Sequence, residues 1–598
     1  MQSHSSLAKV VIALALSASA LPSLFAAENV RTDKPNIVIL FADDLGYADL
    51  GCQGSKEVIS PHADSIAASG ARFTAGYVTA PQCCPSRAGL LPGRYQNRFG
   101  FEDNNSNKSI GGLPLSEKTI ADFLKAAGYT TGMVGKWHLG SAEPYHPYNR
   151  GFDETFWHPN GGILFPDNKT GFLGGLMCGP DPVECSEYST DAFGREACEF
   201  IDRHQRDPFF LYVAFVPPHW PMEAKPEHLA QYAHVRDLHR RTMLGMMASL
   251  DENVGRILQK LRETGLEENT LIFFLSDNGG PTGLPRESPD APFQFGQNTS
   301  LNDPCRGVKG QVLEGGIRVP FLVQWKGRIP AGQVLDHPVI SLDIVPTALA
   351  VSGIAPQPFA RKRAQLDGVN LLPYLTGESD KPPHESLFWR FRFPPNKPEM
   401  YRWANRNGDW KLVKDGLEPL ALYNLADDIG ETNNLAAQHP DRTRAMHAEW
   451  KQWDASNQEP NWGKNWGKLP RAHQAKVQLL DKEIRVQCVG NDPQITFSNI
   501  PAANGPYTLE LKLKSSSKGT GAVFWSDSAQ PKFSANQSVA FAPNHDGERW
   551  HEYSVALPHA TTPLKHLRID PGSAPGLVRF ARIRLKDASG DVVKSWIE

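Results

Sequence analysis

Four apolar, β-rich runs that each end abruptly in polar residues and glycine constrain the fold of this 598-residue chain more than any other feature. They are NIVILFADDLGYADLG from Asn36, YTTGMVGKWHLG from Tyr129, PFFLYVAFVPPHWP from Pro208 and TLIFFLSDNGG from Thr270. Near-continuous apolar runs are typical of strands buried on both faces, as in parallel sheets. The shared ending predicts that all four strands bring polar residues to one edge of a sheet.

Helical patterns separate these runs. Ser116–Gly128 begins with a capping-box-like serine and ends at a glycine, and Arg241–Gly265 carries apolar residues at steps of three and four. Strands that alternate with helices predict a doubly wound, mostly parallel α/β sheet. In such a sheet a ligand binds just beyond the carboxyl ends of the strands, where the polar endings fall.

The chain is long enough for further units after this sheet. The α/β domain is predicted over 28–355, and a hairpin followed by a loop and a helix within Arg406–Ala436 predicts a small α+β subdomain over 356–460. A tandem NWGKNWGK makes 461–473 a predicted linker. From 474 to 598 apolar and polar residues alternate in short segments, which predicts an all-β sandwich with a jelly-roll-like, carbohydrate-binding character.

The N-terminus predicts export. Lys9 precedes the apolar run Val10–Phe25, and small residues follow at Ala26 and Ala27, so 1–27 is read as a signal peptide cleaved near its end. An uncleaved membrane anchor is the alternative, but the run is short and a proline interrupts it. We therefore expect a periplasmic or secreted bacterial protein with no membrane partner after cleavage. The net charge of −3 gives no reason to expect nucleic acid.

Vicinal acids mark the first strand ending and an acid–amide pair marks the fourth. Asp43 and Asp44 end the first run, and Asp277 and Asn278 end the fourth. Neighbouring carboxylates repel each other unless a cation or hydrogen bonds compensate. Either pair alone is compatible with a turn or a helix cap. Together they form an all-oxygen set suited to a hard cation such as Ca²⁺ or Mg²⁺.

A second set of residues near the strand endings is cationic. Lys136 and His138 lie one residue apart in GKWHLG, so on an extended segment they point the same way. His219 follows two prolines at the third ending, and Lys309 lies in CRGVKGQVLEGGIRVP. Each of these residues alone is compatible with an ordinary solvated or hydrogen-bonded side chain. Together they are able to bind a tetrahedral oxyanion and move protons.

Eight cysteines occur, too few for a disulfide-built fold, and none has zinc-like spacing. Cys178 and Cys185 flank the turn-like GPDPVE, so a local disulfide between them is a hypothesis. Cys83 and Cys84 are adjacent and precede Pro85, which favours a helix start. A helix N-terminus with basic residues nearby would lower a thiol pKa and make either cysteine a nucleophile. A soft thiolate nevertheless fits poorly beside a hard cation.

The stretch CCPSRAGLLPGR resembles the signature Cys-x-Pro-Ser-Arg followed by Gly-Arg of the formylglycine-dependent (type I) sulfatases of the alkaline phosphatase superfamily. In register, the matching positions are Cys83, Cys84 as the variable residue, Pro85, Ser86, Arg87, Gly93 and Arg94. Pro92 departs from the family, which commonly has Thr or Ser there. FADDLGYADLG, GKWHLG, PPHWP, SDNGG and EGGIRVP also look like this family in its chain order, and bacterial exported polysaccharide sulfatases in particular.

The resemblance implies that a maturation enzyme oxidises Cys83 to formylglycine, an aldehyde hydrated to a geminal diol. One hydroxyl would attack the sulfur of a sulfate ester, and the other would then expel sulfate. The family pattern implies one Ca²⁺ held by Asp43, Asp44, Asp277, Asn278 and the converted Cys83. It also has a small polar residue against the diol, for which Asn160 is a candidate. Conversion leaves seven cysteines, an odd number, so at least one thiol, which we expect to be that of Cys84, forms no disulfide within the chain.

The remaining roles also follow from the resemblance. Arg87 would hold the formylglycine loop, and Lys136 would steady its hydroxyl. His138 would take the proton that triggers sulfate release. His219 and Lys309 would contact the sulfate and protonate the leaving oxygen.

The function implied is hydrolysis of sulfate esters on carbohydrates derived from polysaccharides such as ulvan, carrageenan, fucoidan or glycosaminoglycan. A phosphodiesterase or phosphonate monoester hydrolase of the same superfamily is one alternative, since both ester types are tetrahedral. A glycan-binding protein without activity is another. The sugar and the sulfate position depend on the loops Phe101–Gly112, Trp157–Asp191 and Gly283–Pro304, which carry no recognisable signature.

Overall fold

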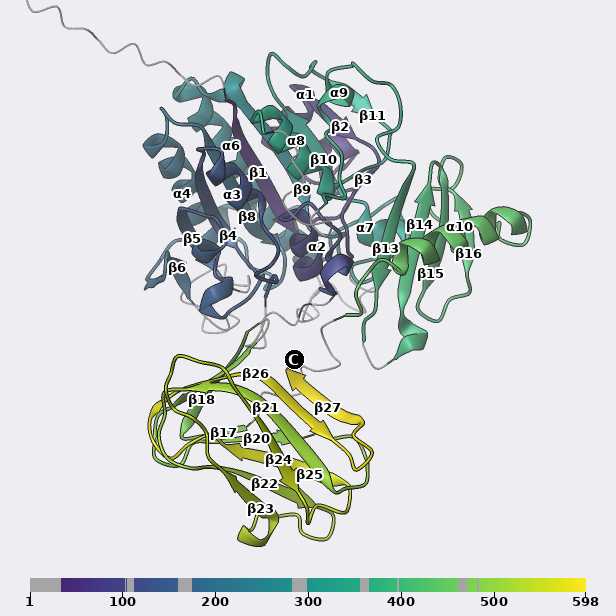
Figure 1. Cartoon of the computed structure of the whole chain (residues 1–598). Coiled ribbons are helices and arrows are strands. Elements are labelled where there is room, and N and C mark those ends of the chain that lie inside the picture. The colour runs from purple at the N-terminus through teal and green to yellow at the C-terminus, as the bar shows by residue number, and fades with distance from the viewer. Residues whose placement is uncertain are drawn as a thin grey trace, which may run out of the picture.

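The four apolar runs form neighbouring parallel strands at the centre of a ten-stranded sheet (Figure 1). They are β1 (Asn36–Asp43), β4 (Thr130–Lys136), β8 (Phe209–Pro218) and β9 (Thr270–Ser276). The order β9-β1-β8-β4 is parallel at every step. All residues of β1, β8 and β9 are buried, as expected for strands covered on both faces. The predicted doubly wound, mostly parallel sheet is confirmed.

The computed structural model describes residues 34–102, 104, 112–159, 175–281, 298–354, 365–394, 397–460, 471–480, 483–498 and 500–597. The predicted signal peptide, Asn160, most of the predicted linker and much of the three substrate loops lie outside the described residues. Among the helices that are described, none has both the length and the apolar character needed to cross a membrane.

Helices cover both faces of the sheet because side chains alternate along each strand. On one face, Val38 and Leu40 pack in a cluster with α1 (Pro61–Ala68), α4 (Ser189–Arg203) and α6 (Leu238–Glu263). On the other, Ile37 and Ile39 pack with α2 (Cys83–Leu90), α3 (Ile120–Ala126) and α8 (Ile344–Val351). The short helices α5 (Pro226–Gln231) and α9 (Leu372–Leu375) complete these layers.

The rest of the large sheet lies to either side of the four central strands, in the order β11-β2-β10-β9-β1-β8-β4-β5-β6-β7. The flanking strands are β2 (Ala71–Phe73), β5 (Glu154–His158), β6 (Leu176–Cys178), β7 (Asp181–Val183), β10 (Phe321–Gln324) and β11 (Gln333–Leu335). A separate pair joins β3 (Gly76–Tyr77) to β12 (Val339–Ile340). Strands β10 and β6 pair antiparallel with their neighbours, so the sheet is mixed at its edges.

The N-terminal cap predicted at Ser116, for the helix that follows the Cys83–Arg94 stretch, is wrong in position. Helix α3 begins at Ile120, and its capping box is formed by Thr119 and Asp122 rather than by Ser116. Thr119 satisfies the free backbone N–H of Asp122, and Asp122 accepts from the backbone of Thr119. The predicted end is confirmed by Gly128, whose φ of 86° suits glycine.

A four-stranded antiparallel sheet follows the α/β part, in agreement with the predicted hairpin and helix. Its strands are β13 (Ser386–Phe391), β14 (Arg402–Asn407), β15 (Trp410–Asp415) and β16 (Ala421–Asn424), and α10 (Pro440–Asp454) packs against it. The exact boundaries of this unit stay predictions.

A buried group that we term the anchor cluster ties this sheet to the α/β part. It consists of Tyr77, Glu314, Arg318, Lys411 and Glu431, all with little or no exposure. Lys411 Nζ on β15 lies 2.8 Å from Glu314 Oε1 and 2.9 Å from Glu431 Oε1. Glu314 opens the short helix α7 (Glu314–Ile317), five residues after Lys309. The cluster therefore fixes the segment that carries a predicted site residue.

The C-terminal region is an all-β sandwich of two antiparallel sheets around its own apolar core, as predicted. One sheet contains β17 (Arg471–His473), β20 (Gln494–Ser498), β25 (Leu564–Asp570), β22 (Gly521–Asp527) and β23 (Ser538–Phe541). The other contains β18 (Ala475–Leu480), β19 (Glu483–Cys488), β26 (Gly576–Lys586), β21 (Tyr507–Ser515) and β24 (His551–Leu557), with β27 (Val592–Ile597) paired to β26. Figure 1 shows the sandwich as a body separate from the α/β part.

Candidate active site

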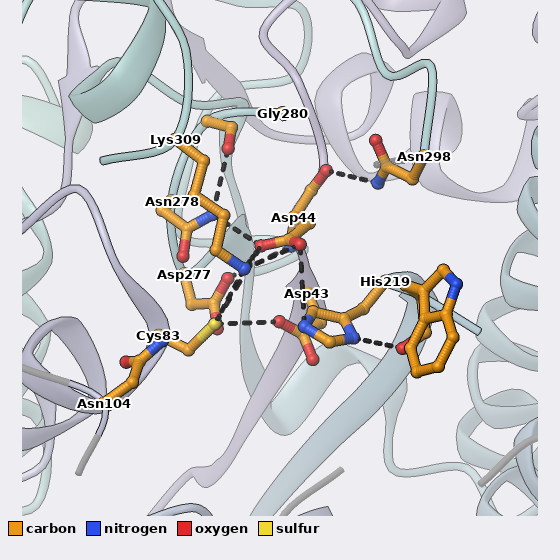
Figure 2. Close-up of polar contacts among 12 residues, drawn as sticks. Asp43, Asp44, Cys83, Asn104, His219, Asp277, Asn278, Gly280, Asn298 and Lys309 are labelled. Atoms are coloured by element: carbon orange, nitrogen blue, oxygen red, sulfur yellow. Dashed lines mark hydrogen bonds and ion pairs between the residues drawn. The ribbon is translucent and has the colours of Figure 1, made fainter. Parts of the chain in front are cut away.

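The ends of β1 and β9 bring three carboxylates and one amide together (Figure 2). Asp43 is the last residue of β1, and Asp44 follows it in the left-handed region with a φ of 65°. The Asp44 backbone N–H donates to Asp277 Oδ1 at 3.1 Å. Asn278 Nδ2 donates to Asp44 Oδ1 at 2.7 Å. The two sequence pairs are therefore one buried group, as their position at equivalent strand ends predicts.

Arg87 of α2 is buried against this group. Its Nε and Nη2 donate to Asp277 Oδ2 at 2.9 and 2.7 Å, and its Nη1 donates to the carbonyl of Lys136 at 3.1 Å. Nη1 also reaches the Tyr212 hydroxyl at 3.4 Å. A guanidinium with no exposure is stable only when such partners replace water. Arg87 thus locks α2 onto the ends of β4 and β9.

Two lysines complete the charge balance. Lys136 Nζ lies 2.5 Å from Asp43 Oδ2 with both side chains buried. Lys309 Nζ lies 2.5 and 2.7 Å from the two carboxylate oxygens of Asp44. Burial alone would raise the pKa of Asp43, but His219, Lys136 and Arg87 outweigh it and lower that pKa to about 2. Against the effect of burial, the pKa of Asp44 is lowered as well, chiefly by Lys309, so both vicinal acids are ionised at neutral pH.

The thiol of Cys83 lies inside this group. Sγ is 3.5 Å from Asp43 Oδ1, 3.9 Å from Asp44 Oδ1 and 3.3 Å from Lys309 Nζ. Cys84 is also buried but packs in the apolar cluster with Phe41 and Ala88. The geometry thus separates the two adjacent cysteines: Cys83 faces the charged group and Cys84 faces the core.

The predicted lowering of the thiol pKa at the helix start is wrong. Burial, together with the Asp277 and Asp43 carboxylates, raises the pKa of Cys83 well above its usual value despite Lys136 and Lys309. Arg94, one of the basic residues expected near the thiol, forms an ion pair with Glu117 instead. An unmodified Cys83 is accordingly a protonated thiol and a poor nucleophile.

The two predicted histidines lie at the margin of the group. His138 is buried directly after β4 with a φ of 58°, and burial followed by Lys136 and Arg87 lowers its pKa well below the usual value. His219 Nε2 lies 3.7 Å from Asp44 Oδ2, while its Nδ1 contacts the carbonyl of Trp220. That contact places the proton of the neutral His219 ring on Nδ1 and turns Nε2 toward the site.

The donor set fits a hard cation. One ligand atom each from Asp43, Asp44, Cys83 and His219 lies within 4.8 Å of the others. Asn278 Oδ1 is buried without a hydrogen-bond partner among the described residues. A buried acceptor of this kind is costly unless something binds it. Carboxylate and amide oxygens are the ligands that Ca²⁺ and Mg²⁺ prefer.

Two asparagines that sequence reasoning missed support this geometry. Asn298 Nδ2 donates to the carbonyls of Asp44 and Pro218 at 3.2 and 2.9 Å. Asn302 accepts from the Gly280 N–H at 2.9 Å and donates to the Gly280 carbonyl at 2.9 Å. Both hold strand-end backbone from a segment that is distant in sequence. A lone asparagine in a polar loop carries no signal that would reveal this.

The predicted disulfide between Cys178 and Cys185 is wrong, since both thiols are free. Cys178 ends β6 and pairs with Asp181 at the start of β7, so Cys185 lies beyond the far end of that strand. Cys185 lies four positions along the chain from Asp181, the residue opposite Cys178, which in extended chain is a distance of about 13 Å. A disulfide needs Cα atoms within about 7 Å. None of the other cysteines forms a disulfide either.

A nucleophile position among ionised acids, an open oxygen site and cationic side chains define a metal-assisted ester hydrolase on a doubly wound fold. Comparison with known families makes this specific. The sulfatase family model matches residues 35–354, and the model for the C-terminal part of N-sulphoglucosamine sulphohydrolase matches residues 308–456. The chain belongs to the sulfatase family and is a sulfuric ester hydrolase; the family uses formylglycine and a metal.

Curated relatives support the assignment. The N-acetylgalactosamine-6-sulfatase of Canis lupus familiaris is 35% identical over 437 residues, which cover 68% of this chain and 78% of the relative. Human arylsulfatase A is 34% identical over 455 residues, covering 67% of this chain and 83% of the relative.

Solved structures agree in fold. Ps i-CgsB, crystallised in complex with k-i-k-neocarrahexaose, is 34% identical with a TM-score of 0.66 and covers 72% of this chain and 94% of its own. A sulfatase from a study of glycosaminoglycan metabolism in Bacteroides thetaiotaomicron is 26% identical with a TM-score of 0.57, covering 71% of this chain and all of its own.

Proposed function

We propose that this chain hydrolyses sulfate esters of polysaccharide-derived carbohydrates, with Cys83 converted to formylglycine and with Ca²⁺ as cofactor. The observation that carries the proposal is the position of Cys83 Sγ, buried between Asp43, Asp44 and Lys309. Its raised pKa makes it useless as a thiolate, yet its place is that of a nucleophile. Formylglycine supplies a hydrated aldehyde with two hydroxyls. One would attack the sulfur of the ester, and the other would then expel the sulfate.

The carboxylates of Asp43, Asp44 and Asp277 and the amide oxygen of Asn278 would hold the calcium ion. The unpartnered Asn278 Oδ1 supports this set. Bound there, Ca²⁺ supplies a positive charge that polarises the sulfate and favours the ionised nucleophile. Lys309 and Lys136, which now neutralise the acids, would turn toward substrate and nucleophile as the ion takes over that task.

Each remaining side chain has a task that its environment favours. Arg87 holds the nucleophile's helix against Asp277, and Lys136, which now contacts Asp43, would steady the nucleophile. His138 has a pKa far below neutrality, so it is an unprotonated base at pH 7 that accepts the proton required for sulfate release. Lys309 and His219 would contact the sulfate and protonate the leaving oxygen, His219 in its protonated form, which carries a second proton on the Nε2 that faces the site.

The substrate class rests on the relatives. One is an N-acetylgalactosamine-6-sulfatase and another was solved with a carrageenan hexaose. Export to the periplasm or medium, predicted from the N-terminal sequence, would place the enzyme where such polymers and their fragments occur. The chain would need a formylglycine-generating maturation enzyme as a partner.

The test is sulfate release from defined sulfated oligosaccharides by enzyme co-expressed with a maturation system. The panel begins with sulfated N-acetylgalactosamine and carrageenan oligosaccharides and includes glycosaminoglycan, fucose and rhamnose sulfates. Phosphodiesters and a phosphonate monoester serve as competing substrates. We expect turnover of at least one sugar sulfate to exceed that of every phosphorus ester. A large excess of phosphodiester turnover, or glycan binding with no turnover at all, would overturn the proposal.

A further inference from the structure

The outward face of the β18–β24 sheet of the sandwich is strongly cationic. Along β19, β26, β21 and β24, the apolar residues point into the core and the intervening ones point out. Seven outward residues are cationic: Arg485, Lys512, Lys514, Arg579, Arg582, Arg584 and Lys586. Three outward residues on these strands are acidic: Glu483, Glu510 and Glu552. We term this surface the basic face.

The acids do not neutralise the basic face, because each carboxylate is shared by two cations. Glu510 contacts Lys586 at 2.6 Å and Arg584 at 3.6 Å. Glu552 contacts Lys512 at 3.0 Å and Arg582 at 3.6 Å. Glu483 contacts Arg485 and Arg579, each at 2.5 Å. The cationic side chains remain 24% to 37% exposed in these pairs. The whole chain carries a net charge of −3, so this local excess does not reflect its composition.

An exposed tryptophan lies among the cations. Trp550, directly before β24, is 37% exposed. Its ring centre lies 5.9 Å from Lys514 Nζ and 5.5 Å from Arg579 Cζ. An accessible indole offers an apolar surface to the C–H side of a sugar ring, and the flanking cations offer charge to its sulfate groups.

The opposite sheet lacks these properties. On its outward side, Thr496, Phe524 and Ala522 surround Arg568. That arginine is neutralised by Asp570 through two hydrogen bonds of 2.7 and 2.6 Å and lies over the Phe524 ring. Strands β22 and β25 therefore carry no row of cations comparable to that of the basic face.

We propose that the basic face binds the chain of a sulfated polysaccharide outside the active site. Repeated sulfates along such a polymer match a row of arginines and lysines, and arginine binds oxyanions through paired N–H groups. A polymer held by the sandwich presents its sulfates to the active site at a raised local concentration. The ligand class rests on the proposed function, but the binding itself does not require catalysis.

The competing occupant of the basic face is the α/β part of the same chain. Arg485, at one edge of the face, lines a cavity of about 410 Å³ together with Glu117, Asp122 and Glu143. If the cations served to hold the sandwich against those acids, their removal would lower stability and leave polymer affinity unchanged. The two occupants are therefore separable by experiment.

The test uses the full chain carrying Cys83→Ala, so that the polymer is not consumed, and measures binding of a soluble carrageenan and of its desulfated form by calorimetry. The face variant combines Lys512→Gln, Arg582→Gln and Arg584→Gln. The control removes the same charge elsewhere on the sandwich through Lys518→Gln, Lys532→Gln and Lys565→Gln, all exposed. We expect the face variant to bind carrageenan about tenfold more weakly, since three charge contacts are lost. The control should stay within about twofold, and the desulfated polymer should bind none of the proteins measurably.

The outcomes are distinct. Equal affinity in face variant and control, or a lowered melting midpoint with unchanged affinity in the face variant, overturns the inference. Should the triple variant not fold, Lys512→Gln with Lys514→Gln tests the same face with smaller changes. In matured enzyme that lacks the Cys83→Ala substitution, the face variant should retain the turnover of a sulfated monosaccharide. Absence of all turnover alongside a difference in polymer binding would overturn the proposed function and leave the basic face supported.

Discussion

The chain buries two charged groups that look alike in composition and differ in what they leave open. The group at the strand ends, which we term the site cluster, contains Asp43, Asp44, Asp277, Arg87, Lys136 and Lys309, together with Cys83, His219 and Asn278. The anchor cluster pairs Glu314 and Glu431 with Lys411 and Arg318. Both bury acids and bases, although Lys309 and His219 of the site cluster are partly exposed. Burial of charge alone therefore does not identify an active site.

The difference lies in solvent access and in the kinds of side chain that each cluster contains. The anchor cluster closes on itself: Lys411, Glu314 and Glu431 have no exposed side-chain surface. In the site cluster, Asn278 Oδ1 lacks a partner among the described residues, a thiol lies among carboxylates, and Lys309 and His219 remain 15% and 19% exposed. A site that must bind and react needs such access, whereas the anchor cluster is closed to solvent and both of its glutamates lie against Lys411.

The largest effect expected is on the site cluster. Cys83→Ala should lower sulfate-ester turnover by more than about 1,000-fold, because it removes the group that becomes the nucleophile. The melting midpoint should change little, since only a sulfur atom is lost. Turnover is measured by sulfate release, with Cys84→Ala as the matched control that keeps activity. Substantial turnover by the Cys83 variant would assign the nucleophile elsewhere.

The anchor cluster should show the opposite response. Lys411→Met leaves two buried glutamates without their shared cation, and breaking a buried pair in this way costs about 3–5 kcal/mol. Urea unfolding measures this loss, and Lys414→Met on the same strand should cost about 0.5 kcal/mol or less because Lys414 is partly exposed. Equal stability of the two variants would mean that the anchor cluster does not support the fold.

Calcium should stabilise the folded chain through the site cluster alone. At a concentration 100 times its dissociation constant, a ligand bound only by the folded state adds about 2.7 kcal/mol. Thermal melts with calcium and with a chelator measure this difference. Asn278→Ala should abolish most of it, whereas Lys411→Met should retain it at a lower midpoint. A calcium shift that survives Asn278→Ala would place the ion elsewhere.

The smallest effect concerns pH and the anchor cluster. Burial and then Glu314 raise the pKa of Glu431 from 4.5 to about 7 in spite of Lys411. The folded chain thus holds this proton more tightly than the unfolded one, so the stabilising contribution is complete below pH 4.5 and is lost as pH rises to about 7. The pKa of Glu314 is lowered to about 2, so its titration changes the stability only below pH 4.5.

Glu431→Gln removes this titration and keeps most of the hydrogen bonding. The free energy of unfolding of the original chain, relative to the variant, should fall by on the order of 2 kcal/mol between pH 4.5 and pH 7. Urea unfolding at the two pH values measures it. A constant difference across the window would show that Glu431 does not titrate there.

The central sheet was predictable from sequence because buried parallel strands leave a local signature of continuous apolar residues. The polar endings of the strands predicted the site at the edge of the sheet. The resemblance to the sulfatase motif predicted that Cys83 becomes the nucleophile. What failed depended on distant neighbours. The thiol pKa is set by carboxylates from other strands, the cap moved from Ser116 to Thr119, and strand register kept Cys178 and Cys185 apart. No local pattern could place Asn298 against Asp44, since 254 residues separate them.

The most direct test of the account is the chemical state of residue 83 in active enzyme. Peptide mass spectrometry of protein co-expressed with a maturation system should show the Cys83 peptide with sulfur replaced by oxygen and two hydrogens lost. The modified fraction should rise in proportion to sulfatase activity across preparations, while Cys84 in the same peptide stays a thiol that can be alkylated. Fully active enzyme with an unmodified Cys83 would contradict the account.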